Sequence, residues 1–519
     1  MINYWWVTRP KRKLDSIPET LAVFAEISLE QKWTGSRGTH LALEEALEKY
    51  GLKRVGERRD QSGSGARTYK VWLKSLGLIF ERADTGSIEL TLAGEAIMNG
   101  DSPVSVLKNQ VLKYQFPSSF SVGRNVKVSD RFKVHPFVFL LRLLNDEKIQ
   151  YLTNDEIGKI VITQGENDSQ KCLEEVIARI LAYRNDGDAS LDSDFEEKYG
   201  TEKTAKRFED PYGHLLDTAN TIVNWLEYTQ LAKRDEARRL VILPDKQNEV
   251  NEIVNKKWDF IPRPEDEEFY QRKYGIDPKH NKDTRNLANT ATITAKMIAE
   301  NKIKQYYITL SLRELITSVD ADLIKEVAEN TGFDEKVVEN VLLDHYPHGS
   351  ASAFMSNYFN MAFKGRDEAV DFEKATTTLF HDVFGFNAIH LGQTGSLSAP
   401  DVLLLSDSCG YTAIIDNKAY SAYSISGDHR NRMVHNYIEG IQNYYSSPYP
   451  IGFFSYIAGG FGKSIDSQIK SISDETGIHG SAITVSGMID LVENHGDYTH
   501  EDIKKLFSID RQILLSDIK

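Results

Sequence analysis

Two short apolar runs near the C-terminus predict adjacent strands of one sheet. Residues 402–405 and 411–415 are almost continuously apolar, and a Cys-Gly turn separates them. Runs of this length between turn residues are typical of buried strands. A further run at 451–457 predicts another strand of the same sheet. Helical spacing over 369–384 predicts a helix that precedes the first of these strands in the chain. This end of the chain is therefore expected to be an α/β domain.

The first part of the chain is mainly helical in pattern. Helical spacing covers residues 41–50 and 66–76, and two strand-like segments, 78–81 and 88–91, follow around a turn at Asp84-Thr85-Gly86. Two helices followed by a two-stranded hairpin predict a winged-helix domain.

A second unit shows a similar order. Residues 137–144 predict an apolar helix, Thr153 to Glu156 has the form of a capping box, and segments 231–234 and 240–244 predict a second strand pair. Prolines and carboxylates at 262–268 oppose continued secondary structure and indicate a boundary. We therefore expect four parts, two winged-helix-like domains and a helical linker followed by the α/β domain, at residues 1–130, 131–261, 262–348 and 349–519.

The predicted sheet carries two carboxylates and an amine at the ends of its strands. Asp416 and Lys418 project from one face because side chains alternate along a strand, and Asp401 can reach that face from the neighbouring strand. Carboxylates, an ammonium and the main-chain carbonyl of Asn417 suit Mg²⁺, a phosphate and an attacking water, which Lys418 would orient or deprotonate. This is a P-D…(D/E)-x-K nuclease motif, although D-x-K alone is also common where a buried strand reaches solvent.

Three segments carry a family resemblance. His390-Leu391-Gly392, Pro400-Asp401 and the run from Ile415 to Ser421 resemble the cleavage domain of the FokI-type restriction endonucleases, which has H-L-G-G, P-D and V-D-T-K-A-Y-S in this order. The resemblance implies Mg²⁺-dependent, sequence-nonspecific DNA cleavage by Asp401, Asp416 and Lys418. It also implies a transient homodimer through the helix after the lysine strand, where residues 422–433 depart from the family pattern. In this superfamily the preceding helix can supply another acid, which makes Glu373 a further metal-ligand candidate or else a surface carboxylate.

The front of the chain has a resemblance of its own. Trp5-Trp6-Val7, Trp33-Thr34-Gly35, residues 112–118 and residues 135–139 are similar to segments of type IIS restriction and nicking endonucleases of the AlwI, MlyI and PleI kind. The resemblance implies binding to a short asymmetric double-stranded DNA site, cleavage a few base pairs to one side, and a cognate methyltransferase as a separate protein.

The charge distribution bears on where DNA would bind. The formal net charge is −14, but residues 31–75 hold ten Lys or Arg against five acids, and the local field decides where a polyanion docks. The helix before the predicted wing would read bases, and other cations there and in an N-terminal basic arm would contact phosphates. The same residues also suit solvated surfaces. The candidates are Lys11, Arg12, Lys13, Arg37, Arg58, Arg59, Arg67 and Lys70.

Composition narrows the class of protein. The 519 residues are 40% hydrophobic and 27% charged, and they include two cysteines, Cys172 and Cys409. Two distant cysteines support neither a disulfide framework nor a zinc module. Without a signal-peptide pattern or an apolar run of about 18 residues, we expect a cytoplasmic protein that does not enter membranes.

The sequence thus predicts a multidomain, Mg²⁺-dependent type IIS restriction endonuclease, with winged-helix recognition domains and a PD-(D/E)xK nuclease domain. A strand-specific nicking endonuclease or a modification-dependent nuclease of the same architecture remains an alternative. An alternative from another class is a noncatalytic winged-helix DNA-binding regulator. The presence of Asp401, Asp416 and Lys418 together argues against it, because a regulator does not need catalytic residues.

Overall fold

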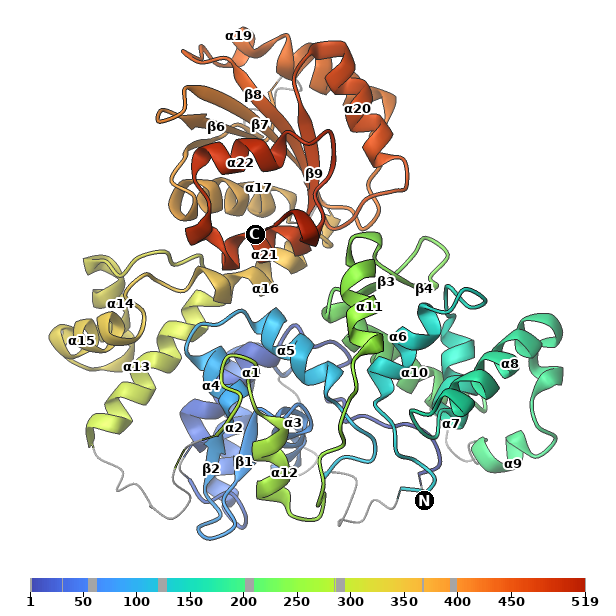
Figure 1. Cartoon of the computed structure of the whole chain (residues 1–519). Coiled ribbons are helices and arrows are strands. Elements are labelled where there is room, and N and C mark those ends of the chain that lie inside the picture. Colours follow the sequence, from blue (N-terminus) through green and yellow to red (C-terminus); the bar gives the residue numbers. More distant parts are fainter. Residues whose placement is uncertain are drawn as a thin grey trace. The chain divides into compact units, whose positions relative to one another are not determined.

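The chain, described here by a computed structural model, divides into two compact units (Figure 1). The first comprises residues 1–309 and 325–341, and the second comprises residues 310–324 and 342–519. The structure describes residues 2–29, 31–54, 63–119, 128–200, 210–283, 285, 295–365, 368–392 and 399–518. The finer division into four parts stays a prediction.

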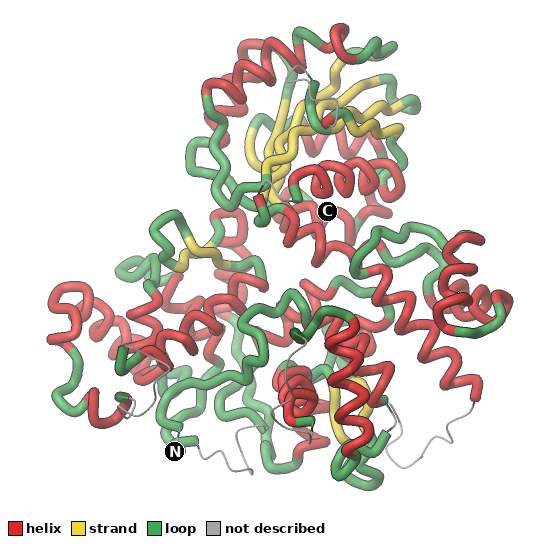
Figure 2. Tube along the Cα trace, turned by 180° about the vertical axis from the view of Figure 1, so that it is seen from behind, coloured by secondary structure: helices red, strands yellow, loops and turns green. Residues whose placement is uncertain are grey.

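The described part of the first unit is mostly helical, with two separate pairs of short strands (Figure 2). β1 (Ile79–Glu81) pairs antiparallel with β2 (Ile88–Leu90), and β3 (Ala232–Arg234) pairs antiparallel with β4 (Leu240–Ile242). Its main helices are α1 (Ile17–Ser28), α2 (Arg37–Lys49), α3 (Ser64–Ser75), α4 (Leu92–Met98), α5 (Pro103–Leu112), α6 (Pro136–Leu144), α8 (Gln170–Asp186), α10 (Gly213–Tyr228), α11 (Gln247–Asn255) and α12 (Glu267–Tyr274).

Amphipathic spacing explains why these helices form. In α3, the buried residues Ala66, Tyr69, Trp72 and Leu73 recur at three- and four-residue intervals and face the core. The predicted helices and both strand pairs are confirmed as elements. Their assembly as winged helices stays a prediction.

Helix α12 packs inside the first unit, although it begins within the stretch predicted to be a boundary. Tyr270 and Tyr274 are each 1% exposed. The Tyr274 hydroxyl donates to the carbonyl oxygen of Gln110 at 2.8 Å. The two aromatic rings therefore belong to the core that α5 helps to form. Further helices, α13 (Ala295–Ser311), α14 (Ala321–Thr331) and α15 (Glu335–His345), cross the division between the units.

The second unit is built on a six-stranded mixed sheet with the order β10-β9-β8-β7-β6-β5. Strands β5, β6 and β7 form an antiparallel series, and β7 to β10 run parallel to one another. The strands are β5 (Asn387–His390), β6 (Val402–Ser406), β7 (Tyr411–Lys418), β8 (Ile451–Ala458), β9 (Gly480–Thr484) and β10 (Arg511–Gln512).

Helices cover both faces of this sheet, as Figure 1 shows for α17 and α20. On one face, η7 (Arg432–Ile438) and α20 (Ile465–Thr476) share a buried cluster with Ile414 of β7 and Tyr456 of β8. On the other face, α17 (Ala369–Thr378) packs on β5, β6 and β7, with α16 (Ala351–Met361) beside it. The α/β domain predicted for this end of the chain is confirmed.

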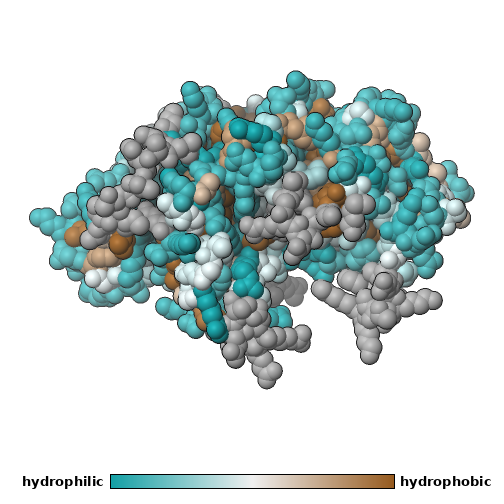
Figure 3. Space-filling model, turned by 90° about the horizontal axis from the view of Figure 1, so that it is seen from below, coloured by the Kyte–Doolittle hydropathy of each residue, from teal (hydrophilic) through white to brown (hydrophobic). Residues whose placement is uncertain are grey.

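The molecular face in Figure 3 is mostly hydrophilic, with hydrophobic residues scattered over it. Among the described helices, none combines the length and the apolar character that crossing a bilayer requires.

Candidate active site

The ends of β6 and β7 place Asp401 beside Asp416. Asp401 immediately precedes β6, whose first residue, Val402, is opposite Ile415 of β7. The main-chain N–H of Asn417 donates to Oδ2 of Asp401 at 2.7 Å. The carbonyl oxygen of Asp401 accepts from the N–H of Leu391 at 2.8 Å. Asp401 is thus fixed from both neighbouring strands.

Asp416 forms a buried ion pair with Lys418. Lys418 Nζ lies 2.7 Å from Asp416 Oδ2, and the two side chains are 14% and 4% exposed. The other carboxylate oxygen, Asp416 Oδ1, is buried and has no hydrogen-bond partner. A buried acceptor of this kind costs free energy unless a cation or water satisfies it.

The electrostatics follow from crowding three charged groups into one buried place. Burial raises the pKa of Asp401 well above its usual range, and the neighbouring charge of Asp416 raises it further. Burial lowers the pKa of Lys418, but the charges of Asp416 and Asp401 outweigh this effect and leave it raised. Lys418 is therefore an ammonium in this arrangement, and its charge does not outweigh the effects of burial and of Asp416 on Asp401.

These residues fit a hard divalent cation. A residue in a strand directs its N–H and C=O to the same side, so the Asn417 carbonyl lies on the side of Asp401. Asp401, Asp416 and this carbonyl are oxygen donors, which Mg²⁺ prefers. The unsatisfied Asp416 Oδ1 supports the fit. Within the described residues, no group of three or more His, Cys, Asp or Glu side chains is arranged to hold a metal, so main-chain and water oxygens would complete the set.

Glu373 of α17 is held by a histidine of the neighbouring strand. His390 Nε2 lies 3.0 Å from Glu373 Oε2. A Cβ on Gly392 would come within 2.1 Å of the same oxygen, so glycine leaves the space that this carboxylate occupies. Glu373 is near enough for its charge to raise the pKa of Asp401, after burial and Asp416. Its role as a metal ligand stays a prediction.

Three aromatic side chains, Tyr423, His429 and Tyr456, lie beside the carboxylates, and sequence reasoning missed this grouping. The hydroxyl of Tyr423 is 2.8 Å from Nδ1 of His429. Burial lowers the pKa of His429, and the charge of Lys418 lowers it further. The rings of Tyr423 and Tyr456 are 5.6 Å apart, and Tyr456 is opposite Asp416 in the β7–β8 register. Tyr423 falls in the segment that departs from the family pattern, and no local signal marked it.

The candidate DNA-binding residues differ in exposure. Arg37, in the first turn of α2, and Arg67, on α3, are exposed. Lys70 is instead 6% exposed, and its Nζ lies 2.5 Å from Glu81 Oε2 on β1. A DNA contact by Lys70 would first have to break this ion pair.

The basic arm at the N-terminus is partly engaged with the rest of the first unit. Arg12 pairs with Asp217. Lys11 is half-buried, whereas Lys13 is exposed. Arg58 and Arg59 lie outside the described residues.

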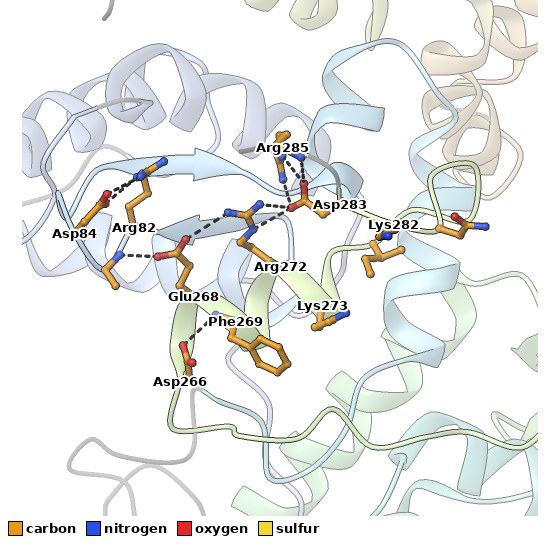
Figure 4. Close-up of a pocket in the computed structure, with 13 residues that line it drawn as sticks. Arg82, Asp84, Asp266, Glu268, Phe269, Arg272, Lys273, Lys282, Asp283 and Arg285 are labelled. Atoms are coloured by element: carbon orange, nitrogen blue, oxygen red, sulfur yellow. Dashed lines mark hydrogen bonds and ion pairs between the residues drawn. The ribbon is translucent and has the colours of Figure 1, made fainter. Parts of the chain in front are cut away.

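A cavity of about 540 Å³ in the first unit lies between the β1–β2 hairpin and α12 (Figure 4). Its charged residues are largely paired with one another. Asp283 binds both Arg272, at 2.8 Å, and Arg285, at 3.0 Å. Glu268 accepts from the main-chain N–H of Ala83 at the hairpin tip, at 2.8 Å. These contacts fasten α12 and residues 283 and 285 to the hairpin, so the cavity is better explained as part of the fold than as a reaction site.

Two family models match the chain. The model of the AlwI restriction endonuclease family matches residues 74–341, and the model of the FokI cleavage domain matches residues 332–514. The type II restriction enzyme StsI of Streptococcus sanguinis is 27% identical over 139 residues, which are 25% of this chain and 22% of that enzyme. The matched segment therefore spans less than a quarter of that relative.

Solved structures of restriction enzymes are also similar. The structure of restriction endonuclease FokI aligns with 99% of this chain and 100% of its own, at 15% identity and a TM-score of 0.28. The BpuJ1 endonuclease binding domain, in complex with modified DNA, aligns with 52% of this chain and 96% of its own, at 18% identity and a TM-score of 0.37.

Proposed function

Because the chain belongs to the AlwI restriction endonuclease family, we propose that it is a Mg²⁺-dependent type IIS enzyme. It binds a short asymmetric site on double-stranded DNA and hydrolyses phosphodiester bonds a few base pairs outside that site. The observation that carries this proposal is the meeting of Asp401, Asp416 and Lys418 at the ends of β6 and β7.

Recognition and cleavage are assigned to different parts of the chain. The first unit, with winged-helix domains, reads the site, and Arg37 and Arg67 are its best-exposed candidates for DNA contact. The second unit cleaves. It holds one set of catalytic residues, so a double-strand break requires either transient pairing of two second units or two successive nicks. A separate methyltransferase protects the host site.

The reaction is hydrolysis at phosphorus. A water oxygen attacks phosphorus and releases a proton to solvent, the P–O3′ bond breaks, and the 3′ oxygen gains a proton from solvent and leaves as an alcohol. Lys418 places its ammonium against the phosphate, where it offsets charge that develops in the transition state. Asp401 and Asp416 orient the attacking water and would hold Mg²⁺ together with the Asn417 carbonyl. When bound, Mg²⁺ supplies Lewis acidity and lowers the pKa of coordinated water.

The direct test replaces Asp416 with alanine. We expect cleavage of target plasmid to stop while binding to a target duplex, measured by gel shift, stays within about twofold of the unchanged chain, since phosphate and base contacts lie elsewhere. Cleavage by the variant at the normal rate with Mg²⁺ present would refute the assignment of the site.

The same plasmid assay separates the alternatives. Open circles that accumulate without linear product would identify a nicking enzyme, and cleavage of methylated plasmid alone would identify a modification-dependent nuclease. Site-specific binding without any Mg²⁺-dependent cleavage would leave the DNA-binding regulator. Run-off sequencing of the digested plasmid gives the site and the offset together.

A further inference from the structure

A chain of buried hydrogen bonds joins β7 to α16 and α17 on the sheet face opposite Asp416. The side-chain amide of Asn417 donates to Thr376 Oγ1 at 2.7 Å, and Tyr358 Oη lies 2.9 Å from the same oxygen. On the basis of the proposed function, we propose that Thr376 is a positioning residue: it sets the orientation of Asn417 and thereby the geometry of the Mg²⁺ site.

Packing alone would favour an apolar residue at position 417. Ala413 and Ile415 precede it on the same face of β7, and both are fully buried apolar residues. Asn417 is 7% exposed, and its Oδ1 is buried without a hydrogen-bond partner. A polar side chain with an unsatisfied oxygen is less favourable here than an apolar one, so its presence points to a task other than stabilising the core.

The hydroxyl of Thr376 is a rigid anchor because all of its hydrogen-bonding capacity is used. It donates its one proton to the carbonyl oxygen of Phe372 at 2.9 Å. It must therefore accept from both the Asn417 amide and the Tyr358 hydroxyl, which fills its two lone pairs. Thr376 and Tyr358 are both fully buried, so no water competes for these bonds.

Asn417 links this anchor to the catalytic carboxylates. Its main-chain N–H holds Asp401 Oδ2 at 2.7 Å, and its carbonyl is directed to the same side. Fixing the side chain at Thr376 limits rotation of the Asn417 backbone, and thus fixes two oxygen donors at once. Metal sites require ligands held to within about half an ångström, so losing the anchor should weaken metal binding more than it weakens the fold.

The test compares two threonines of one helix. Thr376→Val removes the hydroxyl without changing the shape. Thr378→Val is the matched control, because Thr378 also donates to the carbonyl four residues earlier, at 3.0 Å, and Thr378 is partly exposed. Mn²⁺ binding to the full chain without DNA is measured by electron paramagnetic resonance, and the Mg²⁺ dependence of single-turnover cleavage is measured beside it.

We expect Thr376→Val to weaken Mn²⁺ binding and to raise the Mg²⁺ concentration for half-maximal cleavage by roughly tenfold, as for other residues that orient metal ligands. Thr376→Ser should restore both values, and Thr378→Val should change neither. Tyr358→Phe leaves the bond between Asn417 and Thr376 intact but removes a hydroxyl that also lies beside Asn417, and it should have a smaller effect in the same direction.

Unchanged Mn²⁺ binding in Thr376→Val, or equal weakening in Thr378→Val, would overturn the positioning role alone. Absence of both Mn²⁺ binding and cleavage in the unchanged chain would overturn the proposed function, and this inference with it.

Discussion

Replacing Lys418 with methionine should loosen the second unit and leave the first intact. Lys418 is the cation in a buried ion pair, 2.7 Å from a carboxylate that is only 4% exposed, and Asp401 adds a second buried carboxyl group beside it. Removing one partner of a buried pair costs about 3–5 kcal/mol, since the remaining charge stays buried without compensation. Each 1.4 kcal/mol is tenfold in an equilibrium, so local opening should become roughly a hundred- to several-thousandfold more frequent.

Amide hydrogen exchange in the metal-free chain measures this opening strand by strand. We expect β6, β7 and β8 to exchange faster in Lys418→Met. The six tryptophans, Trp5, Trp6, Trp33, Trp72, Trp225 and Trp258, all lie in the first unit. Urea unfolding followed by tryptophan fluorescence should therefore stay unchanged and serve as the internal control.

Two further variants make the result specific. Lys470→Met removes an exposed ion pair with Asp474 on α20, which solvent screens, and should leave exchange nearly unchanged. Asp416→Asn combined with Lys418→Met removes both partners and should recover most of the protection. If Lys418→Met exchanges no faster than Lys470→Met, the ion pair does not stabilise the site and the reasoning is wrong.

Four other changes have definite expected results. Chelation with EDTA should stop cleavage and added Mg²⁺ should restore it, as a gel assay shows; full activity in EDTA would contradict the metal requirement. Gly392→Ala places a Cβ 2.1 Å from Glu373 Oε2, so single-turnover cleavage should slow by about tenfold or more while gel-shift affinity holds. Lys70→Ala should lower the free energy of unfolding of the first unit by about 1–3 kcal/mol, since Glu81 keeps its hydrogen bond from Thr34, and tryptophan fluorescence measures this loss. Arg67→Ala should weaken DNA binding and should lower stability less than Lys70→Ala does; the reverse result for this pair would place Lys70 at the DNA.

The sequence allowed the second unit to be predicted because its signals are local. The apolar runs at 402–405 and 411–415 became β6 and β7, and the alternation of side chains along β7 placed Asp416 and Lys418 on one face. The order of P-D before D-x-K then sufficed to bring Asp401 to the same place. Each step needed only neighbouring residues and one strand pairing.

What could not be predicted depends on contacts between distant parts of the chain. The sequence predicts Lys70 at a DNA surface, but its side chain is largely buried, where it forms an ion pair with Glu81 on β1. The partner of Asn417 is Thr376, which lies 41 positions away on α17, and no pattern along either element reveals that contact. Side-chain partners across elements follow from packing, which spacing within one element does not encode.

Because α12 packs in the core of the first unit, it determines where the chain can be cut to give a folded fragment. A fragment that ends at residue 261 would lose Tyr270 and Tyr274 and would leave the side-chain amide of Gln110 without one of its acceptors, the Tyr274 carbonyl at 3.0 Å. Its exposed apolar groove would favour aggregation. A recognition module intended for fusion to another effector should therefore extend through residue 341, where the first unit ends, which keeps both rings and the other helices of that unit.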